Sequence, residues 1–248
     1  MAYRNSFLNS IPLVTKNLLI INVLMWLATI VLLKQGIDLT TWLGLHYWQA
    51  QEFNAVQLVT YMFMHDSSGI THVFFNMFSL WMFGATLERV LGQKRFLFFY
   101  LACGFGAALI QELVWEFTWE SSFVNIMATQ YSLTYNEVHQ LILTGKMNLA
   151  ISQYLSMHVT IGASGAVFGI LLAFGMIFPN MPMYIIPFPF PIKAKYMVLG
   201  YGLIEIFCGV QGVMDNVAHF AHLGGMLFAF IIIYYWKKKG VIGNNGFY

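Results

Sequence analysis

Two apolar segments each carry a side chain that is typical of covalent catalysis. Ser164 lies in the run GASG over residues 162–165, and His222 lies in the run 218–225 together with a second histidine, His219. A serine hydroxyl becomes a nucleophile when a neighbouring imidazole takes its proton. Polar groups in apolar surroundings are unfavourable unless they have partners or a wet cavity. We therefore expect Ser164 and His222 to meet, with nucleophilic acyl transfer as their chemistry.

His72 and Asn76 are candidates for a second part of that chemistry. They are four residues apart, so a helix would place them on one face. Acyl transfer develops negative charge on the carbonyl oxygen, and side-chain and backbone N–H groups stabilise it. Together with the backbone amide of Ser164, His72 and Asn76 could donate to this oxyanion.

The composition identifies the environment in which these groups work. Of the 248 residues, 59% are hydrophobic and 9% are charged, whereas about a quarter of the residues of a soluble domain are charged. The chain is therefore predicted to be a polytopic membrane protein in a lipid bilayer. The net charge of +2 is too small to indicate nucleic acid as a partner. Cys103 and Cys208 lie in apolar segments and are interpreted as small buried residues, so neither a disulfide nor a metal site is predicted.

Six segments are long and apolar enough to cross a bilayer, which takes about 17 to 25 residues. The predicted spans are 17–34, 70–88, 96–115, 161–178, 196–212 and 217–236. The remaining parts are a tail over 1–16, interfacial helices over 35–65, an insert over about 119–152 and a tail over 237–248. Within the insert, residues 136–143 have the pattern of a short amphipathic helix at the membrane surface. The first span follows no cleavable signal and is expected to stay in the membrane.

Basic residues collect on the cytoplasmic side of membrane proteins, and this sets the orientation. With the amino end inside, ten of the twelve basic residues fall inside: Arg4, Lys16, Arg89, Lys94, Arg95, Lys193, Lys195, Lys237, Lys238 and Lys239. The insert over 119–152 then lies on the outer side. The predicted fold is an all-α membrane protein, a bundle of six transmembrane helices with both termini cytoplasmic.

The candidate polar residues fall at one depth under this topology. At about 1.5 Å per residue, Ser164 and His222 each lie roughly 22 Å above the inner ends of their spans, His72 roughly 25 Å and Asn76 roughly 20 Å. The same estimate puts Glu205 about 15 Å above the inner end of the fifth span. We therefore expect a Ser–His dyad without a carboxylate, and we interpret Glu205 as an acid hydrogen-bonded between helices rather than part of an ion path.

Small residues indicate that the fourth and sixth spans pack closely. Gly165 and Gly169 are four residues apart, and Gly225 lies between two alanines at the same spacing, a pattern that brings membrane helices into backbone contact. His219 competes with His222 for the role of base. It lies one turn nearer the outer surface, so we assign it structural hydrogen bonds.

The motifs together resemble the rhomboid family of intramembrane serine proteases. They are Gly162-Ala163-Ser164-Gly165, His222-x-x-Gly225, His72-x-x-x-Asn76 and Gly84-x-x-x-Glu88-x-x-x-Gly92, in the family's order, over roughly residues 15 to 236. The resemblance implies a six-helix core over 17–236 and hydrolysis of peptide bonds in or near transmembrane segments of single-span or polytopic membrane proteins. It implies Ser164 and His222 as catalytic residues, His72 and Asn76 as oxyanion residues, and no metal or cofactor.

Three departures from the family pattern bear on details. Phe168 stands where members often have a tyrosine packed on the catalytic histidine, so the ring is kept and activity is expected to survive. Ala229 replaces a frequent glycine, which is expected to loosen the contact of the fourth and sixth spans slightly. A Trp–Arg pair often present in the first outer loop is not evident at 53–57.

Two other classes of function compete with the protease. A catalytically silent rhomboid-like protein would bind membrane clients without cutting them, but such proteins typically lack the serine or the histidine. A transporter or channel would need paired charges near the membrane centre and repeated halves, and the sequence has neither. The expected location is an integral, multi-pass position in a bacterial inner membrane, with an organellar membrane as the alternative.

Overall fold

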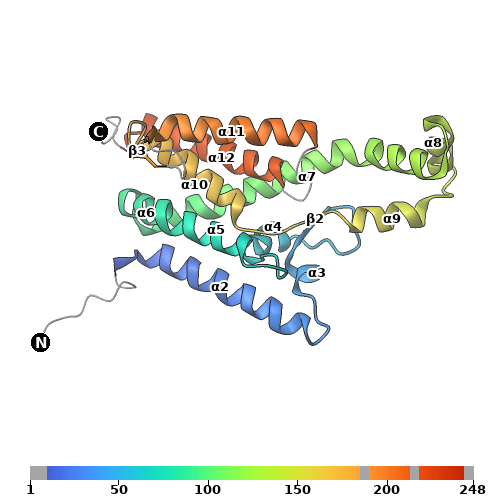
Figure 1. Cartoon of the computed structure of the whole chain (residues 1–248), viewed down its shortest axis with the longest axis horizontal. Helices are drawn as coiled ribbons and strands as arrows, with labels where there is room; N and C mark the ends of the chain where they lie inside the picture. The colour runs from blue at the N-terminus through green and yellow to red at the C-terminus, as the bar shows by residue number, and fades with distance from the viewer. Residues whose placement is uncertain (1–9, 185–189, 213–217, 243–248) are drawn as a thin grey trace, which may run out of the picture.

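The computed structural model describes residues 10–184, 190–212 and 218–242, and almost all of its regular structure is helical (Figure 1). The predicted tails over 1–16 and 237–248 lie partly outside these residues. The elements of the first half are α2 (Leu13–Leu33), α3 (Leu39–Leu43), β1 (Leu45–His46), α4 (Gln57–Thr60), the 3₁₀ turn η1 (Tyr61–Phe63), α5 (Thr71–Ser79), the π turn η2 (Leu80–Gly84), α6 (Ala85–Leu91) and α7 (Gln93–Tyr131). Those of the second half are α8 (Tyr135–Leu143), α9 (Asn148–Ser156), β2 (Val159–Thr160), α10 (Ser164–Ile177), β3 (Pro182–Met183), β4 (Ile192–Lys193), α11 (Ala194–Gln211) and α12 (His219–Lys238).

The predicted all-α membrane fold is confirmed at the level of its helices and their apolar surfaces. Three helices in the described part, α2, α7 and α12, are long and apolar enough to cross a membrane, and α10 is a shorter apolar helix. Large apolar side chains are also exposed, among them Leu24 on α2 and Phe207 on α11. Exposed apolar surface of this extent is stable when lipid rather than water surrounds it.

The strands are two short antiparallel pairs that fix loops. Leu45 of β1 faces Thr160 of β2, and Pro182 of β3 faces Lys193 of β4. The first pair brings the chain that leads into α10 against the first loop of the protein. It therefore helps to set where α10 begins.

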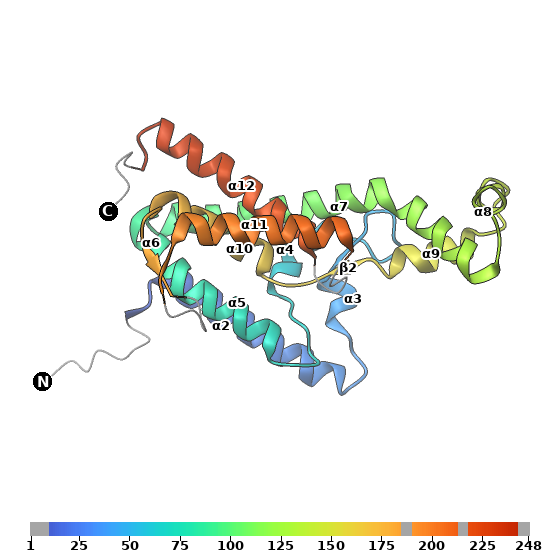
Figure 2. The ribbon, with the colours of Figure 1, turned by 45° about the horizontal axis from the view of Figure 1, so that its top comes forward.

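The core lies where α12 packs against α7 and α10, and both views show these three helices side by side (Figures 1 and 2). Phe96, Phe99 and Tyr100 on α7 have no exposed surface. Because lipid offers no hydrophobic driving force between helices, their association depends on close packing. The bulky residues of α7 and the glycines of α10 and α12 provide that packing.

Glu88 joins α6 to the beginning of α2. Its Oε1 accepts a hydrogen bond from the Val14 N–H at 2.9 Å, and its Oε2 accepts from the N–H and the hydroxyl of Thr15 at 2.7 and 2.8 Å. The first N–H groups of a helix have no partner within the helix, and a carboxylate there satisfies them and complements the helix dipole. The glutamate of the Gly84–Gly92 motif is thus a cap supplied by another helix.

The helix that contains the predicted span 96–115 continues far beyond it. α7 has 39 residues, roughly 58 Å at the usual rise, against a hydrocarbon core of about 30 Å. Its second half, α8 and α9 project from the bundle as an arm (Figure 1). The helix expected over 136–143 is present as α8, and Thr134 and Glu137 form a capping box at its start. The predicted insert is therefore mostly helical.

Candidate active site

Ser164 is the first residue of α10, and it is partly exposed. Before it, the N–H of Gly162 donates a hydrogen bond to the Tyr61 carbonyl at 2.9 Å. Gly162 has a φ of +128°, a region that side chains rarely allow, so the chain turns sharply here and the helix cannot begin earlier. The serine therefore stands at a helix N-terminus, where unpaired backbone N–H groups favour negative charge.

His222 lies within hydrogen-bonding distance of this serine. Its Nε2 is 2.8 Å from Ser164 Oγ, and the ring is buried. Phe168, one turn along α10 from the serine, stacks on the imidazole with ring centroids 4.1 Å apart and planes 8° apart. The nucleophile and base expected from the sequence are thus juxtaposed, and the phenylalanine covers one face of the base.

Two glycines make this approach possible. A Cβ on Gly225 would overlap the carbonyl oxygen of Gly165, so α10 and α12 are in backbone contact at this point. Gly169 extends the contact one turn further: a Cβ there would lie 2.8 Å from Cys103 Cβ and 3.0 Å from the Gly225 carbonyl oxygen. Larger residues would separate the helices and with them Ser164 and His222.

His72 is turned toward the backbone that precedes the serine. A Cβ on Gly162 would lie 2.7 Å from His72 Nε2, so only a glycine leaves room for this ring. The Asp66 N–H donates to His72 Nδ1 at 3.4 Å, which leaves Nε2 as the protonated nitrogen. That nitrogen can donate to an oxygen bound beside Ser164.

Asn76 is buried on the same helix as His72. Its Nδ2 donates to the His72 carbonyl at 3.0 Å, so the amide bonds within its own helix. An amide has a second N–H, which remains for an oxyanion. Of the two expected oxyanion side chains, the structure brings His72 nearer to the turn at Gly162.

One expectation from the sequence is wrong: a carboxylate does reach His222. Glu205 Oε2 lies 2.9 Å from His222 Nδ1 and 2.7 Å from His219 Nδ1, and all three residues are buried. Depth along a helix axis, counted from that helix's own end, does not include the reach of a side chain. The predicted offset of about 7 Å is closed by the two side chains, which extend toward each other from α11 and α12. His219 makes the hydrogen bond that was expected of it, with this carboxylate as partner.

Glu205, His219 and His222 are also the described group best suited by residue type to bind a metal ion. Their ligand atoms lie within 4.8 Å of one another. The separations of 2.7 and 2.9 Å are those of hydrogen bonds. One carboxylate oxygen thus serves both imidazole rings.

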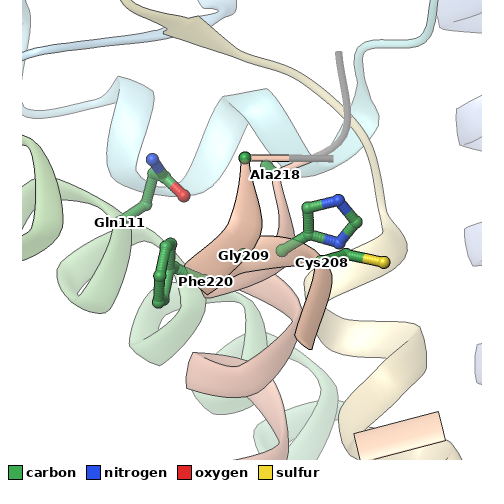
Figure 3. Close-up of a pocket in the computed structure, with 7 residues that line it drawn as sticks. Gln111, Cys208, Gly209, Ala218 and Phe220 are labelled. Carbon is green, nitrogen blue, oxygen red and sulfur yellow. The ribbon is translucent and has the colours of Figure 1, made fainter. Parts of the chain in front are cut away.

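A cavity of about 140 Å³ lies beside this group, where α11 ends and α12 begins. Figure 3 shows Gln111 and Phe220 on one side of it and Cys208 on the other. His219 also lines the cavity, whereas Ser164 does not. The cavity therefore leads to the histidine side of the site.

The loop between α3 and α4, where the Trp–Arg pair is not evident, is held by a glutamine. Buried Gln57 accepts from the His46 N–H at 3.2 Å and donates to the Trp42 and Glu52 carbonyls at 3.1 and 2.9 Å. A glutamine thus fixes the loop from within.

The same loop is also tied to α7, through the carboxylate of Glu116. Glu116 Oε2 accepts from the Tyr47 hydroxyl at 2.6 Å and from Trp48 Nε1 at 2.7 Å. These two hydrogen bonds hold the pKa of Glu116 below its usual range. The loop that pairs with β2 is therefore anchored to the rigid helix α7.

The family model for the rhomboid domain matches residues 52–239. Among curated proteins, the chain is 26% identical over 178 residues to RHOMBOID-like protein 6, mitochondrial, of Arabidopsis thaliana, covering 71% of this chain and 42% of that protein. It is 25% identical over 167 residues to Rhomboid protein 1, mitochondrial, of Saccharomyces cerevisiae, covering 67% of this chain and 38% of that protein. RHOMBOID-like protein 4 of Arabidopsis thaliana is 26% identical over 165 residues, covering 66% of this chain and 30% of that protein.

The matched region spans well under half the length of these relatives. Two of them are named as mitochondrial, so they do not support the bacterial inner membrane expected from the sequence. The family model covers most of the chain and includes Ser164, His222 and the helices that bring them together. A match of this extent over an apolar helical bundle leaves one conclusion: the chain belongs to the rhomboid family and is an integral membrane protein.

Proposed function

We propose that the chain is an intramembrane serine endopeptidase that hydrolyses peptide bonds in or near transmembrane segments of other membrane proteins. The observation that carries this proposal is the 2.8 Å separation between Ser164 Oγ and His222 Nε2. A serine hydroxyl and an imidazole at this distance are the components of an activated nucleophile. Membership of the rhomboid family supports the assignment.

The reaction follows from the groups at the site. Ser164 Oγ bonds to the scissile carbonyl carbon while His222 Nε2 takes the hydroxyl proton. The negative charge on the carbonyl oxygen is stabilised by the Ser164 N–H, His72 Nε2–H and Asn76 Nδ2–H. The C–N bond then breaks and His222 returns the proton to the leaving amine. Water then adds to the carbonyl carbon of the resulting ester while His222 takes its proton. The ester C–O bond breaks, His222 returns the proton to Ser164 Oγ, and the carboxylic acid product leaves.

We also propose the arrangement in the membrane that this reaction needs. Six spans place both termini on the cytoplasmic side, and the site then lies near the outer face, from which water enters. Four of the six spans are the apolar helices α2, α7, α10 and α12. The other two are the continuous helical run 71–91 and α11. Substrate segments with helix-weakening residues are favoured, because a helix must unwind to offer a carbonyl to Ser164.

The test is covalent labelling of the detergent-solubilised protein by a fluorophosphonate. Wild type is compared with Ser164→Ala, His222→Ala and His219→Ala, alongside a rhomboid of established activity. Labelling that is lost in Ser164→Ala and His222→Ala and retained, at a lower rate, in His219→Ala is the expected result. If the reference protein labels and this wild type does not, the protease assignment is wrong and a catalytically silent, client-binding protein takes its place.

A further inference from the structure

Glu205 is a buried acid that the reaction above does not use. It lies in α11, and its side chain faces α12 through hydrogen bonds to His219 and His222. A carboxylate in such surroundings is unfavourable unless hydrogen bonds compensate its charge. Both compensating N–H groups come from imidazoles, and one of these imidazoles is the proposed base. The position of the acid is therefore linked to the state of His222.

The chemistry of His222 depends on which ring nitrogen carries the proton. To take the proton of Ser164, Nε2 must be unprotonated, and the neutral ring must then carry its proton on Nδ1. An ionised carboxylate only accepts hydrogen bonds, so Glu205 Oε2 at 2.9 Å selects the Nδ1–H form. The lone pair of Nε2 then points at Ser164 Oγ, 2.8 Å away.

The carboxylate also bears on the charged state of the base. When His222 takes the proton of Ser164 it becomes an imidazolium, and a negative charge next to Nδ1 stabilises it. Phe168, stacked on the ring face, provides no hydrogen bond to Nδ1. In the part of the chain that the structure describes, Glu205 is the side chain that bonds this nitrogen.

His219 has a place in the same arrangement. It approaches the same oxygen of Glu205 at 2.7 Å, and so restrains the carboxylate from a second direction. A buried polar group held by two partners has little freedom to leave the geometry that it supports. His219 thus orients Glu205, which in turn orients His222.

We propose that Glu205 is a positioning residue of the active site, and that Ser164, His222 and Glu205 act as a triad. This inference rests on the proposed function, in which Ser164 and His222 carry out the reaction. Glu205 sets the tautomer and the orientation of His222 without touching the substrate. Removing its charge is expected to lower kcat and to leave KM nearly unchanged, because the substrate's contacts are not altered.

The decisive variant is Glu205→Gln, studied in the full-length protein in detergent. The amide is similar in shape but can donate a hydrogen bond to Nδ1, which favours the tautomer that cannot act as base. We expect kcat for a transmembrane peptide to fall by up to roughly 10⁴-fold, which is the loss when the aspartate of a serine protease triad becomes an asparagine. The ¹⁵N spectrum of histidine-labelled protein, assigned with His222→Asn, should show the proton of His222 moving from Nδ1 to Nε2.

The matched control is Glu88→Gln, which neutralises another buried glutamate with several hydrogen bonds. It lies near the beginning of α2, outside the active site. We expect its Tm to fall while kcat stays within about threefold of wild type and the His222 spectrum is unchanged. If loss of any buried carboxylate lowered kcat equally through instability, this control would show it and overturn the inference.

The remaining outcomes separate the inference from the proposed function. Glu205→Gln with a kcat within threefold of wild type overturns the triad, as does a loss of kcat without change in the His222 spectrum. In both cases the proposed function still stands if wild type cleaves the peptide and Ser164→Ala does not. Absence of any cleavage dependent on Ser164 overturns the proposed function and the inference together.

Discussion

At the residue scale, Phe168 offers a direct test of how the base is held. Its ring lies 4.1 Å from the imidazole of His222 and nearly parallel to it. Stacked rings contribute about 0.5 to 1.5 kcal/mol beyond their burial, which corresponds to roughly a two- to tenfold change in rate. Phe168→Leu is therefore expected to lower kcat by this factor, whereas Phe168→Tyr keeps the ring and the rate. Steady-state cleavage by both variants measures the effect, and equal rates for the two would contradict it.

Some chemical groups of the site could be predicted from the sequence better than others. Ser164 and His222 were identified because a hydroxyl and an imidazole in apolar segments need partners, and at one depth they are partners for each other. Glu205 is likewise an acid within an apolar span. Its predicted depth, about 15 Å above the inner end of its span against about 22 Å for His222, separated it from the other groups. Position along a helix axis does not include side-chain reach or the level at which a neighbouring helix ends. Contacts between helices are set by the tertiary fold and not by local sequence.

At the element scale, the contact of α10 with α12 decides whether the site forms. Gly225→Ala would force a methyl group onto the carbonyl oxygen of Gly165. Overpacking usually costs about 1 to 3 kcal/mol, and here the obstacle is backbone that cannot rotate away. We expect Gly225→Ala to lower Tm and to abolish fluorophosphonate labelling.

Gly200→Ala is the matched control for that substitution. It lies within α11, and a Cβ there meets nothing within 4 Å. Alanine in place of a helical glycine is favourable by roughly 0.5 to 1 kcal/mol, so this variant should keep its labelling and lose no stability. A Gly225→Ala protein as stable and as reactive as Gly200→Ala would refute the role of the contact.

The boundaries of elements could be predicted less well than their existence. The apolar run over 161–178 indicated a helix, but α10 begins only at Ser164, since the turn at Gly162 and the pairing of β2 with β1 use the residues before it. That turn places the serine at a helix N-terminus, which hydropathy cannot reveal. Similarly, α7 does not end where its apolar part ends, because a polar helix can continue outside the membrane.

At the scale of the whole molecule, we expect the arm to be separable from the site. Phe123 on α7 and Tyr154 on α9 are in ring contact, with centroids 5.3 Å apart, and the anchor at Glu116 lies on the bundle side of this contact. Replacing residues 126–150 with a short Gly–Ser linker therefore removes the end of the arm and keeps these contacts. We expect fluorophosphonate labelling within about threefold of wild type. Lost labelling in a variant with an unchanged Tm would show that the arm acts on the site.

The proposed orientation in the membrane is supported by where basic side chains lie in the fold. Arg89, in α6, donates a hydrogen bond to the Ser10 carbonyl, 3.0 Å away and just before the beginning of α2. Lys237, at the other end of the chain, donates to the Met176 carbonyl at 2.7 Å, near the end of α10. The beginning of α2, α6 and the last turns of α10 and α12 lie at one end of the bundle, opposite the arm (Figure 1), so basic residues from distant segments gather there. Such a cluster favours the cytoplasmic side.

This orientation predicts opposite accessibility for two exposed positions. Leu143→Cys, at the end of α8, should react with a membrane-impermeant maleimide in intact right-side-out vesicles, and Lys239→Cys should react only after the membrane is opened. The native Cys103 and Cys208 are buried, so they contribute little background. The reverse pattern would place the arm inside and the serine near the cytoplasmic face. Substrates would then have to be cut, and water supplied, from that side, since Ser164 lies at the end of α10 that faces the arm.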